Sequence, residues 1–240
     1  MVTLGKFAAE NVDSCPVCGG DGEFKIDAPT QYDFTLSVYY CPNCESSYNN
    51  PRMTKEAMDE FYAGGEYMAN TLVKRNGRGS FGERRRALRN MIILTQFVTN
   101  INETKRALDV GCSQGHFLER IKDWAFGVET VGYDIYADPE AVCEVISDKS
   151  EITGEFDLIS CVHVLEHMHD PLAELEWMNS LLVEDGILLL EVPIASYVII
   201  EHPVMFSVKS MAILMERVGL EHYTTLDVPA LESCILIARK

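Results

Sequence analysis

The 240-residue chain has no long apolar run and no periodic glycine or proline, and these absences exclude several classes of protein. No stretch approaches the roughly 18 consecutive apolar residues that indicate a membrane-spanning helix. The first ten residues hold no apolar core of the kind a secretory signal carries. The 16 Gly and 9 Pro are scattered, which excludes a collagen-like or low-complexity chain. With 47% hydrophobic residues, we expect a globular protein located in the cytoplasm.

Positive charge is scarce, because 20 Lys and Arg oppose 37 Asp and Glu and leave a net charge of -17. Such a chain repels phosphate backbones at long range, so nucleic acid is not the first partner expected. Residues 71–106 are the exception, since nine Lys and Arg meet two Glu there and give a charge of +7. This basic segment is either a docking surface for an anionic substrate or a solvated helix face.

Four of the eight cysteines form two C-x-x-C pairs, Cys15 with Cys18 and Cys41 with Cys44, separated by 22 residues. This spacing is close to that of a zinc ribbon. Zinc takes four thiolates tetrahedrally, and four protein ligands leave no position for catalysis, so the predicted site is structural. Two disulfides are disfavoured in a cytosolic chain. The remaining, isolated cysteines are expected to be small core residues: Cys112, Cys143, Cys161 and Cys234.

The pattern of the chain predicts three parts: a zinc-ribbon module at 1–52, a helical linker and lid at 53–103, and an α/β domain at 104–240. In the last part strands alternate with helices, which is typical of a doubly wound, mostly parallel sheet, here of seven strands. The strands are expected at 32–40, 106–110, 130–133, 141–146, 156–162, 187–192, 223–228 and 234–238. Helices are expected at 54–68, 83–99, 116–124, 171–182 and 207–218, with Trp124 on a buried stripe and a loop at 70–82.

The segment 107–117, ALDVGCSQGHF, indicates a ligand site where a strand runs into a glycine turn. Gly111 and Gly115 let the backbone approach a ligand that any Cβ would block. The turn lacks the third glycine of a dinucleotide fingerprint, and Asp109 suits a cationic ligand better than a phosphate. The next strand ends at Asp134, 23 residues after Gly111, where a carboxylate can accept both hydroxyls of a ribose.

These segments, with 156–167 (FDLISCVHVLEH) and 181–188 (LLVEDGIL), resemble the motifs of class I S-adenosylmethionine-dependent methyltransferases. The resemblance covers about residues 104–240. It implies a Rossmann-like fold and S-adenosylmethionine as cofactor. The residues it implies as cofactor-binding are Asp109, Gly111, Ser113, Gly115, His116, Asp134, Asp148, Cys161 and His163.

The N-terminal cysteine pairs followed by a methyltransferase domain are also similar to bacterial zinc-containing methyltransferases, including sugar C-methyltransferases that act on nucleotide-linked deoxyketosugars. Those enzymes carry a Glu-His pair after the fifth strand, which Glu201 and His202 match. Two features depart from their pattern. Ile200 stands where they have a tyrosine, and their large C-terminal domain is not part of this sequence.

The candidate catalytic groups follow two strand ends. His163 and His167 follow the fourth strand, and Glu201 and His202 follow the fifth, beside the expected methyl-donor end of the cofactor. A histidine suits a general base because its ordinary pKa lies near working pH. The resemblance also implies that Tyr67 folds over the cofactor. Glu166 and His169 are expected to have structural roles, facing solvent or capping a helix.

Three functions are compatible with these observations. The first is a methyltransferase for a small anionic metabolite, such as a nucleotide-linked sugar. The second is an RNA methyltransferase with an N-terminal zinc module, which the net charge disfavours and the basic segment favours. The third is a non-catalytic cofactor-binding protein that uses its ribbon for protein contact. Affinity for RNA against nucleotide sugars separates the first two, and cofactor turnover separates the third.

Overall fold

The computed structural model describes residues 2–30, 34–63, 79–136, 138–194, 199–228 and 232–240. No helix in this described part is long and apolar enough to cross a membrane. The strands are β1 (Val2–Leu4), β2 (Phe7–Glu10), β3 (Glu23–Pro29), β4 (Thr35–Tyr40), β5 (Ser47–Asn49), β6 (Arg52–Met53), β7 (Arg106–Val110), β8 (Glu129–Tyr133), β9 (Val145–Ile146), β10 (Phe156–Val162), β11 (Leu182–Pro193), β12 (Val204–Met205), β13 (Glu221–Val228) and β14 (Ser233–Arg239). The helices are α1 (Lys55–Ala63), α3 (Gly79–Phe97), α4 (His116–Ile121), α5 (Pro171–Leu181) and α6 (Val208–Val218), with short 3-10 turns η1 (Ile101–Glu103), η2 (Lys149–Glu151) and η3 (Leu165–His167).

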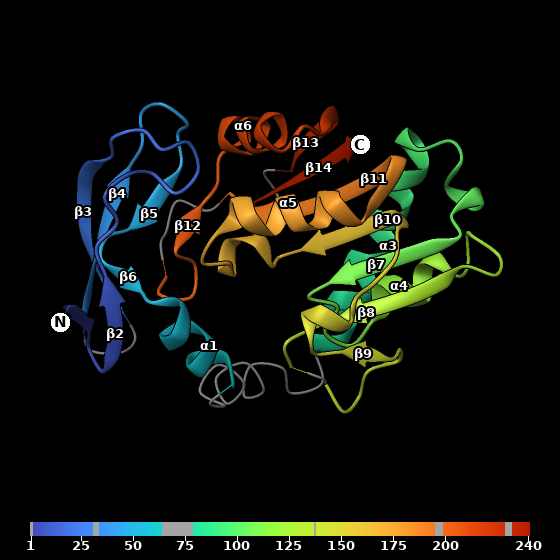
Figure 1. Ribbon diagram of the computed structural model, residues 1–240, viewed down its shortest axis with the longest axis horizontal. Helices are drawn as coiled ribbons and strands as arrows, with labels where there is room; N and C mark the ends of the chain where they lie inside the picture. The colour runs from blue at the N-terminus through green and yellow to red at the C-terminus, as the bar shows by residue number, and fades with distance from the viewer. Residues whose placement is uncertain (1, 31–33, 64–78, 137, 195–198, 229–231) are drawn as a thin grey trace. The chain divides into compact units, whose positions relative to one another are not determined.

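A seven-stranded sheet confirms the predicted α/β architecture, with the order β13-β14-β11-β10-β7-β8-β9. The pairs of β7 with β10, β7 with β8, and β8 with β9 are parallel. Figure 1 shows β10, β7 and β8 side by side. Because Ala107, Leu108 and Val110 are fully buried, β7 is a central strand, and its end positions the glycine turn.

Several predicted boundaries are wrong for identifiable reasons. The third strand of this sheet is only β9, two residues, because the stretch before it forms turns. Strand β11 begins at Leu182, directly after α5, so Gly186 lies inside it rather than before it. Helix α3 begins at Gly79, inside the predicted loop. Trp124 is 43% exposed, since α4 ends at Ile121 and the buried helical stripe ends with it.

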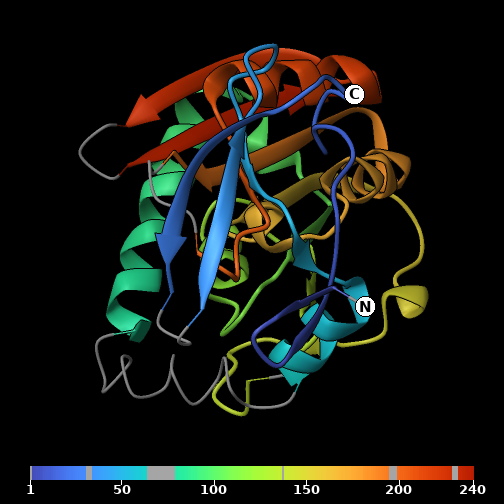
Figure 2. The same ribbon diagram turned by 90° about the vertical axis from the view of Figure 1, so that its left-hand side faces the viewer.

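Two small antiparallel sheets hold the N-terminal residues, one with the order β1-β2-β6 and the other β12-β5-β4-β3. Strand β4 lies within the predicted strand at 32–40, and it pairs with β3 as Figure 2 shows in blue. The sequence analysis missed β3, although Phe24, Ile26 and Ala28 alternate with charged residues there, and this alternation was the available signal. Strand β12 comes from far along the chain and adds to β5, with Val204 opposite Tyr48.

The chain divides into two compact units, which are described separately below. Unit 1 comprises residues 1–60, 163–177 and 191–236, and unit 2 comprises residues 61–162, 178–190 and 237–240. The predicted cofactor loop belongs to unit 2. The cysteine pairs and the predicted catalytic residues from His163 to His202 belong to unit 1.

Candidate functional site

The glycine turn of unit 2 is a tight left-handed loop between β7 and α4. Gly111, Ser113 and Gly115 have φ values of 72°, 49° and 78°, which lie in the region that glycine favours. A Cβ on Gly115 would lie 2.2 Å from the Cys143 sulfur, so this position has no room for a side chain. The amides of Gly111 and Cys112 both donate to the carbonyl of Tyr133, which ties the loop to the end of β8.

Asp134 directly follows β8, as predicted, and it holds the glycine turn, a role that the sequence analysis did not give it. Its Oδ2 accepts a hydrogen bond from the Ser113 amide at 2.9 Å, and its Oδ1 accepts from the Tyr136 amide at 3.0 Å. Each carboxylate oxygen can accept a further bond. The half-buried side chain of Asp134 can therefore hold the loop and still accept hydrogen bonds from the hydroxyl groups of a ligand.

Asp109 lies at the end of β7, 5% exposed, and accepts a 2.6 Å hydrogen bond from the hydroxyl of Ser160 on β10. Burial raises the pKa of Asp109 from 3.8 to about 7, although the Ser160 bond opposes the rise. A carboxyl group in such an environment becomes a strong partner for a cation, because a nearby positive charge would restore its ionised form.

This raised pKa predicts a pH-dependent stability. Between about pH 4 and pH 7 the folded chain retains the Asp109 proton that the unfolded chain loses, so the free energy of unfolding falls as pH rises. The contribution is about 1.4 kcal/mol per pH unit. We expect Asp109→Asn, which keeps an acceptor for Ser160, to remove this part of the pH dependence of stability. Urea unfolding of both proteins at about pH 5 and about pH 7 measures it, and an equal pH dependence in the two would contradict the prediction.

The other predicted cofactor residues of unit 2 lie in varied settings. His116 is 4% exposed, and its Nε2 lies 3.2 Å from Gln114 Oε1. Cys161 is fully buried within β10. Asp148 caps η2, and its carboxylate accepts from the Ser150 amide and hydroxyl. Cysteines 112 and 234 are buried as expected, whereas Cys143 is only half-buried.

Sequence reasoning missed Gln114 and Ser160, which support the loop. Gln114 is 8% exposed and its Nε2 donates to Asp138 and Glu140 at 3.3 and 3.4 Å. An amide inside the glycine turn, followed by two acids in the next loop, was a signal that could have been used.

Unit 1 gathers histidines and glutamates from three segments of the chain. The Nδ1 atom of His163 lies 3.5 Å from Glu166 Oε1, and its Nε2 lies 3.2 Å from Glu191 Oε1. His167 Nδ1 donates to the backbone carbonyl of Glu201 at 3.0 Å. The rings of His167 and His202 meet edge to face, with centroids 4.5 Å apart. The structure thus brings together the four histidine and glutamate residues predicted after the two strand ends.

The charge states in this cluster differ from residue to residue. Burial, helped by the neighbouring His167, lowers the pKa of His202 from 6.5 to about 3, so its ring is neutral at physiological pH. Burial acts to raise the pKa of Glu166, but the hydrogen bond from His163 and the nearby histidines hold it below its usual value. Glu166 is therefore an ionised carboxylate, although it is only 1% exposed.

The prediction that Glu166 faces solvent or caps a helix is therefore wrong, because its side chain is buried. The turn η3 directs it inward because Leu165 beside it is fully buried. Glu191, also 1% exposed, was missed altogether. A single carboxylate after Leu188, Leu189 and Leu190 in an apolar strand was the available signal. His169 has the structural role expected of it, bonded to Glu10 at 2.9 Å.

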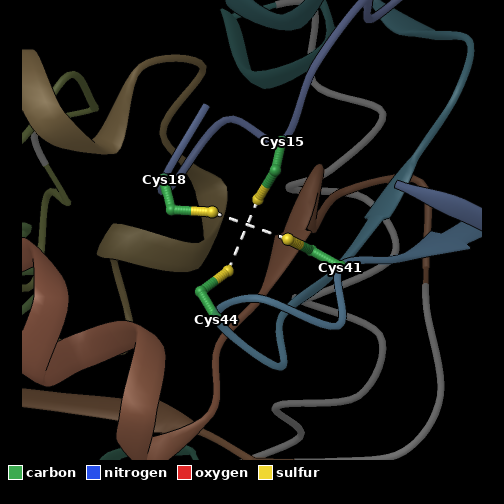
Figure 3. Close-up of side chains that lie close together, drawn as sticks. All are labelled: Cys15, Cys18, Cys41 and Cys44. Carbon is green, nitrogen blue, oxygen red and sulfur yellow. Dashed lines mark hydrogen bonds between the residues drawn. The ribbon is translucent and has the colours of Figure 1, made fainter. Parts of the chain in front are cut away.

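The four paired cysteines form a second cluster in unit 1, and Figure 3 shows their sulfur atoms pointing toward one point. The ligand atoms all lie within 4.8 Å of one another. The Sγ atoms of Cys15 and Cys44 lie 3.5 Å apart, and those of Cys18 and Cys41 lie at the same distance. A hydrogen bond from Cys44 holds the pKa of Cys15 down at about 4, although burial opposes this.

The two cysteine turns share one backbone pattern. The amide of Gly19 donates to the Cys15 carbonyl and that of Glu45 to the Cys41 carbonyl, each at 2.8 Å. Gly19 and Glu45 both have left-handed φ values, 72° and 63°. Glu45 therefore adopts the same turn as the glycine of the first pair.

Two predicted features fall wholly or partly outside the described residues. Tyr67 lies outside them, as do three cations of the basic segment: Lys74, Arg75 and Arg78. On the described helix α3, Arg84 and Arg85 are exposed. Arg106 instead pairs with Glu129 at 2.9 Å. The described cations of the basic segment therefore lie partly on α3 and partly at the start of β7.

The comparisons with known proteins agree on one family. A family model described as a methyltransferase domain matches residues 81–226. The ubiquinone biosynthesis O-methyltransferase of Actinobacillus pleuropneumoniae serotype 7 (strain AP76) is 29% identical over 104 residues. The match covers 35% of this chain and 44% of that protein, so this chain matches less than half the length of its curated relative.

Two solved structures resemble the fold. The Burkholderia thailandensis 1,6-didemethyltoxoflavin-N1-methyltransferase, solved with 1,6-didemethyltoxoflavin and S-adenosylhomocysteine, superposes with a TM-score of 0.59 at 17% identity, covering 84% of this chain and 98% of that one. The magnesium protoporphyrin IX methyltransferase of Synechocystis PCC 6803, solved with S-adenosylmethionine, gives 0.50 at 15% identity, covering 65% and 79%. At these identities the likeness shows the fold.

Proposed function

We propose that this chain, which belongs to the methyltransferase-domain family, transfers the methyl group of S-adenosylmethionine to a small anionic metabolite. The observation that carries the proposal is the left-handed loop 111–115 held by Asp134, with Asp109 buried beneath it. Backbone amides in such a loop can approach a ligand closely. The two carboxylates offer acceptors for ribose hydroxyls and for a cationic group.

The proposed acceptor class follows from charge and from the relatives. A net charge of -17 disfavours an RNA substrate, while exposed Arg84 and Arg85 on α3 offer a local attraction for a smaller anion. The two solved enzymes compared above are named for small-molecule acceptors, and the curated relative is named for ubiquinone biosynthesis. A nucleotide-linked sugar is one metabolite of the proposed kind.

The histidine cluster of unit 1 contains groups of the kind that methyl transfer needs to remove a proton from the acceptor. A lone pair of the acceptor forms the new bond to the methyl carbon, while the bond from that carbon to sulfur breaks and leaves its electron pair on sulfur. The acceptor's proton must pass to a base. The neutral ring of His202, together with His167 and Glu201, forms the group that we propose to position the acceptor and receive that proton.

We further propose that Cys15, Cys18, Cys41 and Cys44 hold one structural zinc ion in a zinc ribbon. The support is the convergence of four sulfur atoms and the matched backbone turns that present them. Four thiolates fit tetrahedral zinc and leave no open position. The two cysteine pairs come from turns that connect strands. The ion would therefore link these turns to each other and stabilise the short strands around them.

A metabolite-pool assay tests the proposed activity. The purified full-length protein is incubated with S-adenosylmethionine and a cell extract, and the extract is searched by mass spectrometry for a compound that gains one methyl group. We expect an anionic small molecule and equimolar S-adenosylhomocysteine. Methylation confined to the RNA fraction would overturn the proposed acceptor class. Binding of the cofactor without any turnover would favour a non-catalytic role.

Replacing His202 tests the acceptor-side residues. Since loss of a group that takes the acceptor's proton costs about 10²–10⁴-fold in rate, His202→Ala should lower kcat by this factor and leave cofactor affinity unchanged. Steady-state kinetics and calorimetry measure the two quantities. His169→Ala is the matched control, because His169 bonds Glu10 rather than the cluster. Turnover in His202→Ala equal to that of the control would exclude the assigned role.

A further inference from the structure

A second group of metal-ligating side chains lies in unit 1, away from the four cysteines. Glu166 and His167 come from η3, and His202 comes from the segment before β12. Their ligand atoms all lie within 4.8 Å of one another. Two imidazoles and one carboxylate that meet in a largely buried place can serve as metal ligands, because each offers a lone pair to the same small volume.

Two atoms of this group are buried with no hydrogen-bond partner among the described residues. They are Oε2 of Glu166, whose side chain is 1% exposed, and Nδ1 of His202. A buried polar atom without a partner costs about 1–3 kcal/mol, and more when the group is charged. Native structures leave few such atoms, so two from neighbouring residues need an explanation. A cation bound between them would satisfy both.

The surroundings hold these side chains in the way that outer-sphere groups hold metal ligands. His167 donates its Nδ1 proton to the Glu201 carbonyl, which leaves the lone pair on Nε2, the atom that faces Glu166 at 3.9 Å. Ligating histidines commonly donate their other ring nitrogen to a carbonyl in this manner. The Nδ1 atom of His163 lies 3.5 Å from the same oxygen, Glu166 Oε1, so that carboxylate is held as well and its Oε2 is left for a cation.

We propose that Glu166, His167 and His202 form a second metal site, which binds a divalent transition-metal ion of the zinc type. Imidazole nitrogens favour such ions over magnesium or calcium, which prefer oxygen ligands. The side chains must close by small rotations to reach the roughly 2.0–2.2 Å that zinc requires. Unlike the four-cysteine site, this one has three protein ligands and an open position.

The open position suits an oxygen atom of the acceptor. A metal ion there would attract an anionic oxygen and increase the acidity of a bound hydroxyl. With the ion bound, His167 and His202 would act on the acceptor through the metal and would not receive its proton directly. This role rests on the proposed function, whereas the metal site itself does not, because metal binding is measured without any methyl transfer.

Cobalt and zinc titrations of the full-length, untagged protein test the site. Metal is removed, and the chain is then titrated with Co²⁺ and, separately, with Zn²⁺. We expect two equivalents per chain that survive dialysis. One cobalt ion should show thiolate charge-transfer absorption from the cysteine site, and the other should show only the weaker bands of nitrogen and oxygen ligands. Tight binding of a single equivalent by wild-type protein would overturn the proposal whatever the methyltransferase assay shows.

Variants then assign the second equivalent. Glu166→Gln and His202→Ala should each lose it, or weaken it at least 10-fold, and keep the thiolate absorption, which also reports that the chain has folded. His169→Ala should keep both equivalents, since it changes a neighbouring histidine that lies outside the ligand set. A second equivalent that persists in the Glu166→Gln, His202→Ala double variant would also overturn the site. If the variants fail to fold, the wild-type cobalt spectrum decides alone.

Discussion

Cys15→Ser should release zinc and unfold the strands around the two cysteine turns. Serine is a poor zinc ligand, and structural zinc sites contribute on the order of 10 kcal/mol to the folding of small modules, so loss of one thiolate should cost several kcal/mol. Metal analysis of the purified protein should show one zinc fewer per chain. Thermal unfolding followed by circular dichroism should show a lower or broadened transition.

The effect should extend beyond residues 1–52, because later segments of unit 1 are attached to the cysteine turns. Ser207, which caps α6, donates to the carbonyl of Cys44 at 2.8 Å, and Arg217 donates to the carbonyl of Val17. The side chain of Asn49 donates to the carbonyl of His202 at 3.3 Å, so methyl transfer should fall as well.

Cys143→Ser is the control for the zinc prediction, since this cysteine is half-buried and lies outside the cluster. It should keep the full zinc content. Cys15→Ser protein that retains both its zinc and its melting temperature would show that the four cysteines do not form the proposed site.

The cofactor loop was predictable because its signals are local. The residues from Arg106 to Gly115 encode a buried strand and then left-handed turns, and β7 has the bounds that the sequence predicts. The acid at the end of the next strand was equally readable, because parallel neighbours place their carboxyl ends at one edge. Periodicity and turn chemistry determine such features within about 30 residues.

The histidine cluster of unit 1 was less predictable because its contacts join distant segments. Glu166 and His202 are 36 positions apart, and whether a carboxylate in a short turn faces inward depends on packing that no local pattern records. The same holds for β12, a two-residue strand whose partner β5 lies more than 150 positions earlier. Strand pairing over that separation is a tertiary property, and the sequence of β12 alone carries little strand signal.

Asp134→Ala should weaken the binding of S-adenosylmethionine by about 2–4 kcal/mol, taking 1–2 kcal/mol for each of two hydrogen bonds to a charged group. This corresponds to roughly 30- to 1,000-fold in Kd. The variant removes the proposed acceptor for two ribose hydroxyls. It also removes the acceptors for the Ser113 and Tyr136 amides, so the loop itself loses support.

Isothermal titration calorimetry with S-adenosylmethionine and S-adenosylhomocysteine measures the change. Asp123→Ala serves as the matched control, because Asp123 is also an aspartate of unit 2 but pairs on the surface with Arg120 at 2.8 Å. Asp134→Asn, which keeps one acceptor oxygen but not the charge, should fall between the two. Because both ligands carry the same ribose, they should weaken equally. An affinity in Asp134→Ala equal to that in Asp123→Ala would mean that the ribose binds elsewhere and that Asp134 serves only to hold the loop.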